Sequence, residues 1–140
     1  MILYLETSNL VKLYVREKDS DVVRDSVRTA EVVATSVLAY AEARAALARK
    51  LREKGLSEES HNSVKEALDR DWPSYFVLNA AAGTARAAGD LAEKHGLRGF
   101  DALHLASAME LRAAGASGLR FSTADARLRD AASLEGFETA

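Results

Sequence analysis

The sequence predicts an α/β fold in which helices cover both faces of a parallel sheet. Short, mostly apolar runs alternate with longer segments of helical periodicity along all 140 residues. Alternation of this kind is typical of consecutive β–α units, whose strands lie parallel. Because the sequence contains no linker, repeat or low-complexity segment, we expect one domain over residues 1–140, which is long enough to bury its own core.

Short runs rich in apolar residues mark the strands. A run of this length and composition favours a strand that is buried on both faces. The expected strands are Ile2–Leu5, Val32–Thr35, Tyr75–Leu78 and Leu119–Ser122, and Phe137 is assigned to a terminal edge strand.

Capping residues and helix breakers set the limits of the helices. Thr7 and Ser8 offer side-chain caps to a first helix, and the segment 19–21 opens a second. Glycine or proline ends most of the others, because neither continues a helix readily. The remaining helices are expected from Ser36 to about Lys54, from Ser57 to Trp72, from Ala80 to His95, from Gly99 to Ala114 and from Ala124 to Ala132.

Composition narrows the possible functions. The chain has no cysteine, which excludes a disulfide framework and a thiolate zinc site. The net charge is −2, so RNA binding would require a local basic stripe, bound cations or a partner. Since the sequence shows neither a signal-peptide pattern nor an apolar run near the roughly 20 residues that span a bilayer, we expect a soluble, cytoplasmic protein without membrane contact.

Acidic residues in separate segments carry the main functional signal. The carboxyl ends of parallel strands form the ligand-binding edge of an open α/β sheet, so acids that follow strands can meet there. Carboxylates that lie close together repel, so one or more would have to take up a proton unless a divalent cation removes the conflict. Oxygen ligands select Mg²⁺ or Mn²⁺. Such ions activate water and neutralise a phosphodiester. The candidates are Glu6 and Asp125 after strands, Asp101 at a helix start, and Glu42 about two turns into a helix.

Each acid also has a structural explanation. Glu6, Asp101 and Asp125 could cap a helix or complement its dipole. Glu42 lies among small and apolar residues, where a carboxylate needs a partner. Arg49 or a neighbouring lysine could supply that partner in an ion pair.

Polar residues beside the acids have two possible roles. Thr7, Ser8 and Thr123 could orient the metal ligands through hydrogen bonds, or they could cap helices. His104 follows Asp101 at the i+3 position, so both can share one side of a helix. For His104 a packed or hydrogen-bonded place in the core is favoured over a metal role.

Basic residues outside these segments give a weaker signal. Arg44, Arg49 and Lys50 could contact RNA phosphates, or they could form a solvated helix end, where cations are favoured. His61 and His95 lie in polar stretches and are expected at the surface.

Four segments together resemble a known family. MILYLETSNLVKLY is similar to the opening of PIN-domain proteins, especially the VapC-type toxins of toxin–antitoxin pairs. TSVLAYAEARAAL, RGFDALHLASAMEL and LRFSTADARLRDAA resemble their second, third and fourth motifs, with Glu42, Asp101 and Asp125 in the acidic positions. The resemblance spans nearly the whole chain, with the motifs in the family's order.

The resemblance implies both a fold and an activity. It implies a three-layer α/β/α sandwich around a central parallel sheet, and a Mg²⁺- or Mn²⁺-dependent endoribonuclease that hydrolyses RNA. It also implies a homodimer and a protein antitoxin as partner. In the mechanism that we expect, Glu6, Asp101 and Asp125 hold metal while Glu42 binds or orients a water or a second ion.

One position departs from the family pattern. The first acid, usually Asp, is Glu6 here, and the extra methylene moves the carboxylate by about one C–C bond. The site could adapt to the longer side chain, or its activity could be weakened or abolished. The main alternative is therefore a catalytically impaired PIN-like module that binds antitoxin or RNA without cleaving. ATP-driven, dinucleotide and aspartyl-phosphatase chemistry are unsupported, because the sequence lacks GxxxxGK[ST], a GxGxxG motif after a strand, and a DxD motif after the first strand.

Overall fold

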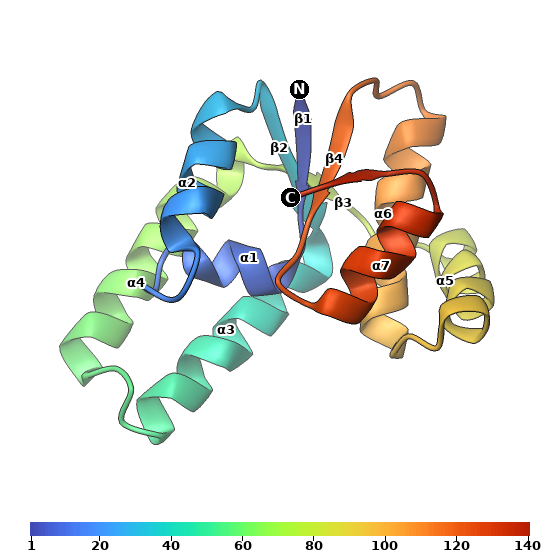
Figure 1. The fold of residues 1–140 in the computed structure, drawn as a ribbon. Helices are drawn as coiled ribbons and strands as arrows, with labels where there is room; N and C mark the ends of the chain where they lie inside the picture. Colours follow the sequence, from blue (N-terminus) through green and yellow to red (C-terminus); the bar gives the residue numbers. More distant parts are fainter.

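A central sheet of five strands organises the molecule, and the computed structural model describes residues 1–140 (Figure 1). The strands lie in the order β3-β2-β1-β4-β5, and every neighbouring pair is parallel. Their bounds are β1 (Ile2–Leu5), β2 (Val32–Ser36), β3 (Phe76–Leu78), β4 (Leu119–Ser122) and β5 (Glu138–Thr139).

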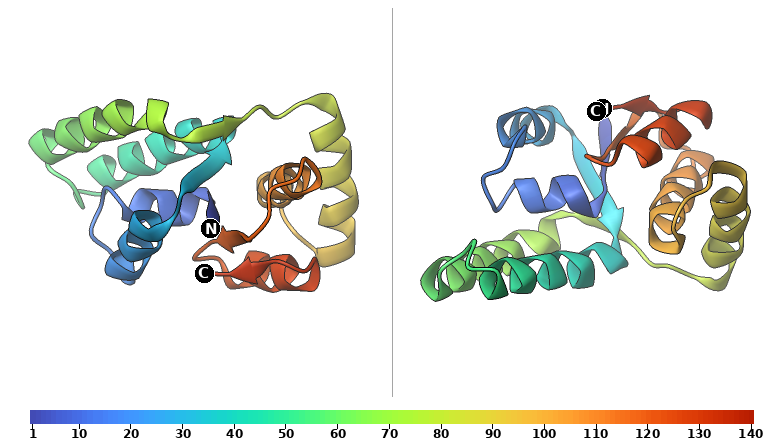
Figure 2. Two further views of the ribbon diagram at one scale, coloured as in Figure 1. Left: turned by 90° about the horizontal axis from the view of Figure 1, so that it is seen from above. Right: turned by 60° about the horizontal axis from the view of Figure 1, so that its bottom comes forward.

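Helices cover both faces of this sheet, which confirms the predicted three-layer α/β/α sandwich. Helices α1 to α4 gather on one face and α5 to α7 on the other (Figure 2). Their bounds are α1 (Thr7–Lys12), α2 (Ser20–Thr29), α3 (Val37–Arg52), α4 (Glu58–Asp71), α5 (Ala82–His95), α6 (Gly99–Ala113) and α7 (Ala126–Leu134), with a 3-10 turn at Trp72–Ser74. None of the helices combines the length and the apolar character needed to cross a membrane.

Strand β1 contributes to the cores on both faces. Leu3 and Leu5 belong to the buried cluster beneath α1 to α4, whereas Tyr4 packs with Phe121 in the cluster beneath α5 to α7. Successive side chains of a strand point to opposite faces, and all three of these β1 residues are fully buried. This double burial explains why the run Ile2–Leu5 contains no charged residue.

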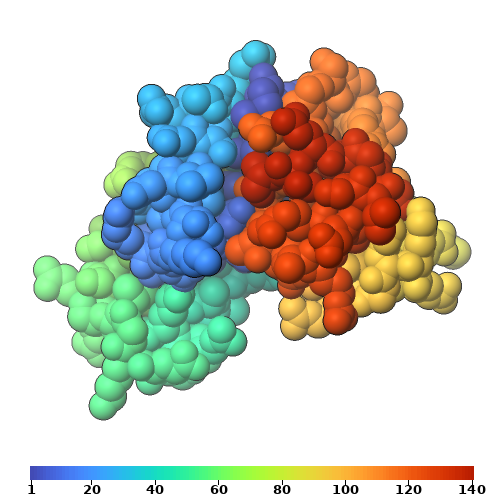
Figure 3. Space-filling model, viewed as in Figure 1, coloured from blue at the N-terminus to red at the C-terminus, as the bar shows by residue number.

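The strand register brings the ends of β1 and β4 together. Leu5 pairs with Ser122, and the backbone N–H of Glu6 donates to the carbonyl of Ser122 at 3.0 Å. Glu6 and Thr123 therefore leave the sheet side by side at its carboxyl edge. In the space-filling view, the surface is indented between α3 and the side formed by α5 to α7 (Figure 3).

Several predicted boundaries differ from the structure by one or two residues, and three of the differences matter for the site or the core. Glu6, rather than Thr7 or Ser8, caps α1, because its carboxylate accepts a hydrogen bond from the N–H of Ser8. Helix α5 begins at Ala82, later than predicted. Phe137 precedes β5 instead of lying in it, and its side chain is buried in the core.

Replacing Phe121 by alanine tests the core beneath the site. The residue is fully buried and stacks on Tyr4 with ring centroids 5.3 Å apart, so the substitution removes apolar burial and leaves a cavity. We expect the free energy of unfolding, measured by urea denaturation, to fall by about 3–5 kcal/mol. The control Val22→Ala, at a residue that is 61% exposed, should change it by less than about 0.5 kcal/mol. An equally small loss for Phe121→Ala would contradict this core.

Candidate functional site

Glu6 is anchored where β1 passes into α1. Its Oε2 accepts hydrogen bonds from the N–H of Ser8 at 3.1 Å and from the hydroxyl of Thr123 at 2.8 Å. The hydroxyl of Ser8 donates to the same oxygen. Because Glu6 is only 5% exposed, these bonds fix its carboxylate at the edge of the sheet.

Glu42 ends a chain of polar side chains that reaches into the core. Its Oε1 accepts a hydrogen bond from the hydroxyl of Thr7 at 2.8 Å and lies 2.7 Å from Nε2 of His104. The other ring nitrogen of His104 lies 2.9 Å from the hydroxyl of Tyr4. The partners that Glu42 requires are therefore His104 and Thr7, and an ion pair with Arg49 or a lysine is not formed. His104 itself is fully buried and hydrogen-bonded, as predicted.

His104 favours the ionised form of Glu42. Burial by itself raises the pKa of the Glu42 carboxyl, but the hydrogen bond and the charge of His104, together with the hydroxyl of Thr7, outweigh it. The resulting pKa lies below its ordinary value, so Glu42 is ionised at neutral pH. Burial also raises the pKa of Tyr4 well above its ordinary value, and the inner end of the chain is therefore a neutral phenol.

Asp101 and Asp125 share one arginine. Nε of Arg98 donates to Oδ2 of Asp101 at 3.3 Å, and its Nη2 lies 3.9 Å from Oδ2 of Asp125. Asp125 also caps α7, because its Oδ1 accepts a hydrogen bond from the N–H of Leu128 at 2.9 Å. Capping is thus one established role of Asp125, and it leaves Oδ2 for other contacts.

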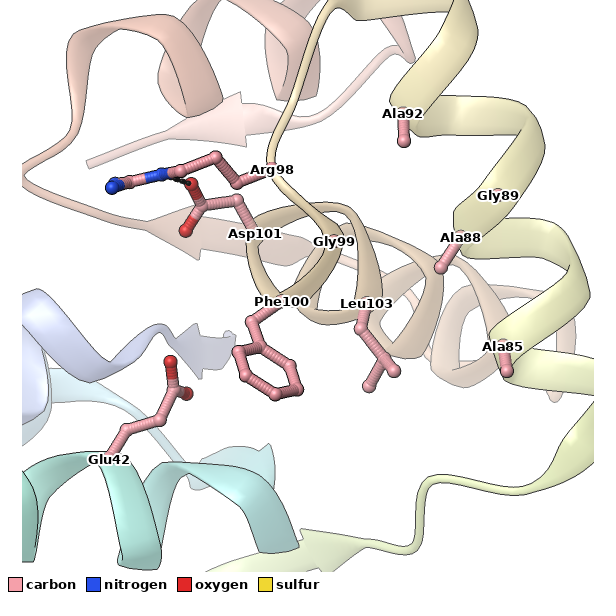
Figure 4. A pocket seen from close by; sticks show the side chains of 10 residues that line it. All are labelled: Glu42, Ala85, Ala88, Gly89, Ala92, Arg98, Gly99, Phe100, Asp101 and Leu103. Carbon is pink, nitrogen blue, oxygen red and sulfur yellow. Dashed lines mark hydrogen bonds and ion pairs between the residues drawn. The ribbon is translucent and has the colours of Figure 1, made fainter.

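A shared hydroxyl and two cavities connect the acids. The hydroxyl of Thr123 donates to Glu6 and accepts a hydrogen bond from the N–H of Asp125 at 3.1 Å. Glu42 and Asp101 line a cavity of about 650 Å³ (Figure 4). Asp101 and Asp125 line a second cavity of about 390 Å³. The structure therefore places all four predicted acids at one edge of the sheet.

The donor chemistry of these acids fits a hard divalent cation. Each carboxylate engages one oxygen in hydrogen bonds and leaves the other without one, namely Oε1 of Glu6, Oε2 of Glu42, Oδ1 of Asp101 and Oδ2 of Asp125. Solvent reaches these four oxygens. None of them is buried, because the only buried side-chain N or O atom without a hydrogen-bond partner is Nε of Arg120. No three acidic or histidine side chains lie close enough to hold one ion jointly, so metal binding would require these side chains to rotate.

The predicted RNA-contact residues lie along α3 and line neither of these cavities. All three have partners within the protein. Arg44 donates to the hydroxyl of Tyr40 at 2.9 Å, Arg49 lies 3.9 Å from Glu53, and Lys50 lies 2.7 Å from Glu17. Their contact with RNA stays a prediction.

Sequence analysis missed two arginines and misplaced one histidine. Arg98 contacts two of the acids, and Arg127 lines the cavity that holds both of them. The i, i+3 spacing of Arg98 and Asp101 on one helix was the available signal for the first. The prediction that His95 lies at the surface was wrong, since its side chain is 6% exposed and lies 3.0 Å from Glu135.

Comparison with known sequences assigns the family. The profile described as "PIN domain" matches residues 3–134. This chain belongs to the PIN-domain family. It is 35% identical to "Ribonuclease VapC45" of Mycobacterium tuberculosis (strain CDC 1551 / Oshkosh), over 99% of this chain and 94% of that protein. It is 37% identical to "Ribonuclease VapC46" of M. tuberculosis (strain ATCC 25618 / H37Rv), over 96% and 92% of the two chains. These relatives place this PIN-domain chain in the VapC group.

Solved structures share the fold of this VapC-group protein. FitAcB from Neisseria gonorrhoeae superposes with a TM-score of 0.72 at 21% identity, covering 99% of this chain and 96% of that one. A toxin–antitoxin complex from Klebsiella pneumoniae gives a TM-score of 0.65 at 15% identity, covering 88% and 86%. At these identities the likeness concerns the fold alone.

Replacing Thr123 by valine tests the hydroxyl that joins Glu6 to Asp125 in this PIN-domain protein. Thr123 is fully buried, so the change removes one of the donors to Oε2 of Glu6 and leaves the N–H of Asp125 without its acceptor. We expect the free energy of unfolding to fall by about 1–3 kcal/mol in urea denaturation. Ser26→Ala, which removes an exposed hydroxyl bonded to the carbonyl of Val22, should cost less than about 0.5 kcal/mol. If the two losses are equal, the hydroxyl of Thr123 does not organise the site.

Proposed function

We propose that this protein is a metal-dependent endoribonuclease that hydrolyses RNA phosphodiesters and acts as the toxin of a toxin–antitoxin pair. The observation that carries the proposal is the position of Glu6, Glu42, Asp101 and Asp125 at the carboxyl edge of the sheet, each with an oxygen free of hydrogen bonds. The VapC relatives support RNA as the substrate, since both are named ribonucleases.

The acids divide into metal ligands and a residue that orients water. Glu6, Asp101 and Asp125 would hold Mg²⁺ or Mn²⁺, and Glu42 would orient a water or a second ion. When bound, such an ion supplies an activated water and neutralises charge on the phosphodiester. Oxygen-only donors favour these hard cations over zinc or copper.

Hydroxyl groups around the acids position them for this role. Ser8 and Thr123 hold Oε2 of Glu6, which directs the other oxygen of that carboxylate to solvent. Thr7 holds Oε1 of Glu42. Groups that orient the ligands of a metal in this way strongly affect its affinity.

A protein antitoxin and a second copy of this chain are the proposed partners. A toxin–antitoxin complex with this fold supports the antitoxin. Large exposed apolar side chains offer contact surface for both, and they include Val22 on α2, Phe100 on α6 and Leu134 on α7.

The rival function is an impaired PIN-like module that binds antitoxin or RNA without cleaving it. Two observations favour it: Glu6 is one methylene longer than the family's usual Asp, and no three acids lie at joint coordination distance. Metal binding and cleavage distinguish the two functions, because the module needs neither.

Asp101→Asn tests the metal site. The substitution removes one negative charge and one metal ligand, so we expect Mn²⁺-dependent RNA cleavage to fall by about two orders of magnitude. The wild type should gain about 2.7 kcal/mol of stability when Mn²⁺ is present at a hundred times its Kd, and thermal unfolding of the variant should lose this gain. Asp90→Asn, at an exposed carboxylate of α5, is the matched control. A Mn²⁺-induced shift that survives in Asp101→Asn would rule out Asp101 as a ligand.

Glu6→Asp tests whether the longer side chain limits the reaction. Restoring the shorter carboxylate should raise the Mn²⁺-dependent cleavage rate, because a misplacement of about 1 Å can cost on the order of a hundredfold. Glu31→Asp serves as the control, since the Glu31 side chain is 82% exposed. An unchanged rate would mean that Glu6 is not limiting, and no cleavage by either protein would favour the impaired module.

A further inference from the structure

Two arginines lie beside the acids and have no role in the function proposed above. Arg98 and Arg127 are the only basic residues lining the smaller cavity, and Asp101 and Asp125 complete its lining. Arg98 occupies the position just before α6, and Arg127 lies in the first turn of α7, so the two cations approach the cavity from different elements. The cavity of about 390 Å³ has no hydrophobic lining residue.

We propose that Arg98 and Arg127 bind a backbone phosphate of the RNA next to the four acids, an inference that rests on the proposed ribonuclease function. A phosphodiester that approaches four carboxylates is repelled unless cations lie in its path. Arginine suits this role because its planar guanidinium donates to two phosphate oxygens at once. The ligand is the sugar–phosphate backbone, so no base preference arises at this position.

Arg98 can leave its present partners at little cost. Its side chain is 83% exposed and contacts Asp101 at 3.3 Å and Asp125 at 3.9 Å. Because solvent screens the exposed guanidinium, these contacts contribute little to stability. In Figure 4 the guanidinium of Arg98 extends past Asp101, away from Phe100 and Glu42. Arg98 thus offsets the charge of the two aspartates when RNA is absent and turns to the phosphate when RNA binds.

Arg127 is held in place without an acidic partner. Its Nη1 donates to the carbonyl of Gly96 at 3.3 Å, and the remaining N–H groups of the guanidinium are available to a ligand. The predicted basic residues of α3, Arg44, Arg49 and Lys50, line neither of the cavities beside the acids. The pair at the cavity is therefore better placed for a phosphate beside the acids than the predicted group on α3.

The salt dependence of RNA binding tests this pair. Fluorescence anisotropy of a labelled single-stranded RNA in EDTA, where the proposed metal-dependent cleavage is off, gives Kd at several salt concentrations. A single-strand phosphate contact contributes about 0.7 to the slope of log K against log[salt], or about a fivefold change in Kd at 0.1 M salt. We expect Arg98→Gln and Arg127→Gln each to lower this slope by about 0.7 and to raise Kd about fivefold at 0.1 M salt. The change should be the same for RNAs of different sequence. Arg28→Gln is the matched control, because Arg28 is an exposed arginine of α2 that pairs with Asp25.

The outcomes separate this inference from the function on which it rests. Larger losses for both cavity variants than for Arg28→Gln support the phosphate site. If both behave like the control while the wild type cleaves RNA in Mn²⁺, the phosphate site is wrong and the ribonuclease proposal stands. If the wild type neither binds nor cleaves RNA, the ribonuclease proposal fails and the phosphate site fails with it.

Discussion

Several carboxylates can occupy one edge of a sheet only if each negative charge is compensated, and this constraint shapes the site. Glu6 is compensated by hydroxyl and amide donors, Glu42 by a buried histidine, and Asp101 and Asp125 by one arginine and a helix terminus. In each carboxylate one oxygen accepts hydrogen bonds and the other accepts none. The same arrangement that stabilises the protein therefore leaves oxygen ligands available at the edge.

Strand β1 connects this edge to the interior. It is the central strand, it is buried on both faces, and its last residue leads directly into Glu6. Tyr4 links the core beneath α5 to α7 with His104, and His104 holds Glu42 on α3. Because these contacts join both helical layers at the end of one strand, packing in the core and the position of the acids depend on each other.

The positions of β1 to β4 were predictable because each is a short, mostly apolar run. Strand β5 consists of Glu138 and Thr139, and its position was predicted at the neighbouring Phe137. The meeting of the acids at one edge followed from parallel topology, although their catalytic role is still a proposal. The partners of the acids were not predictable: Glu42 on α3 and His104 on α6 are 62 residues apart in sequence, and only the three-dimensional fold shows that their side chains are bonded. The burial of the His95 side chain was missed for the same reason, because its partner Glu135, at the C-terminal end of α7, is 40 residues away in the sequence.

The central claim is that these acids together bind one kind of hard cation. Anomalous diffraction from a crystal soaked in Mn²⁺ measures this most directly, because it locates the ion without reference to activity. The account predicts a peak among the carboxylates of Glu6, Asp101 and Asp125, with the guanidinium of Arg98 displaced from Asp101. A map with no peak at this edge, while Arg98 keeps its contact with Asp101, would contradict it.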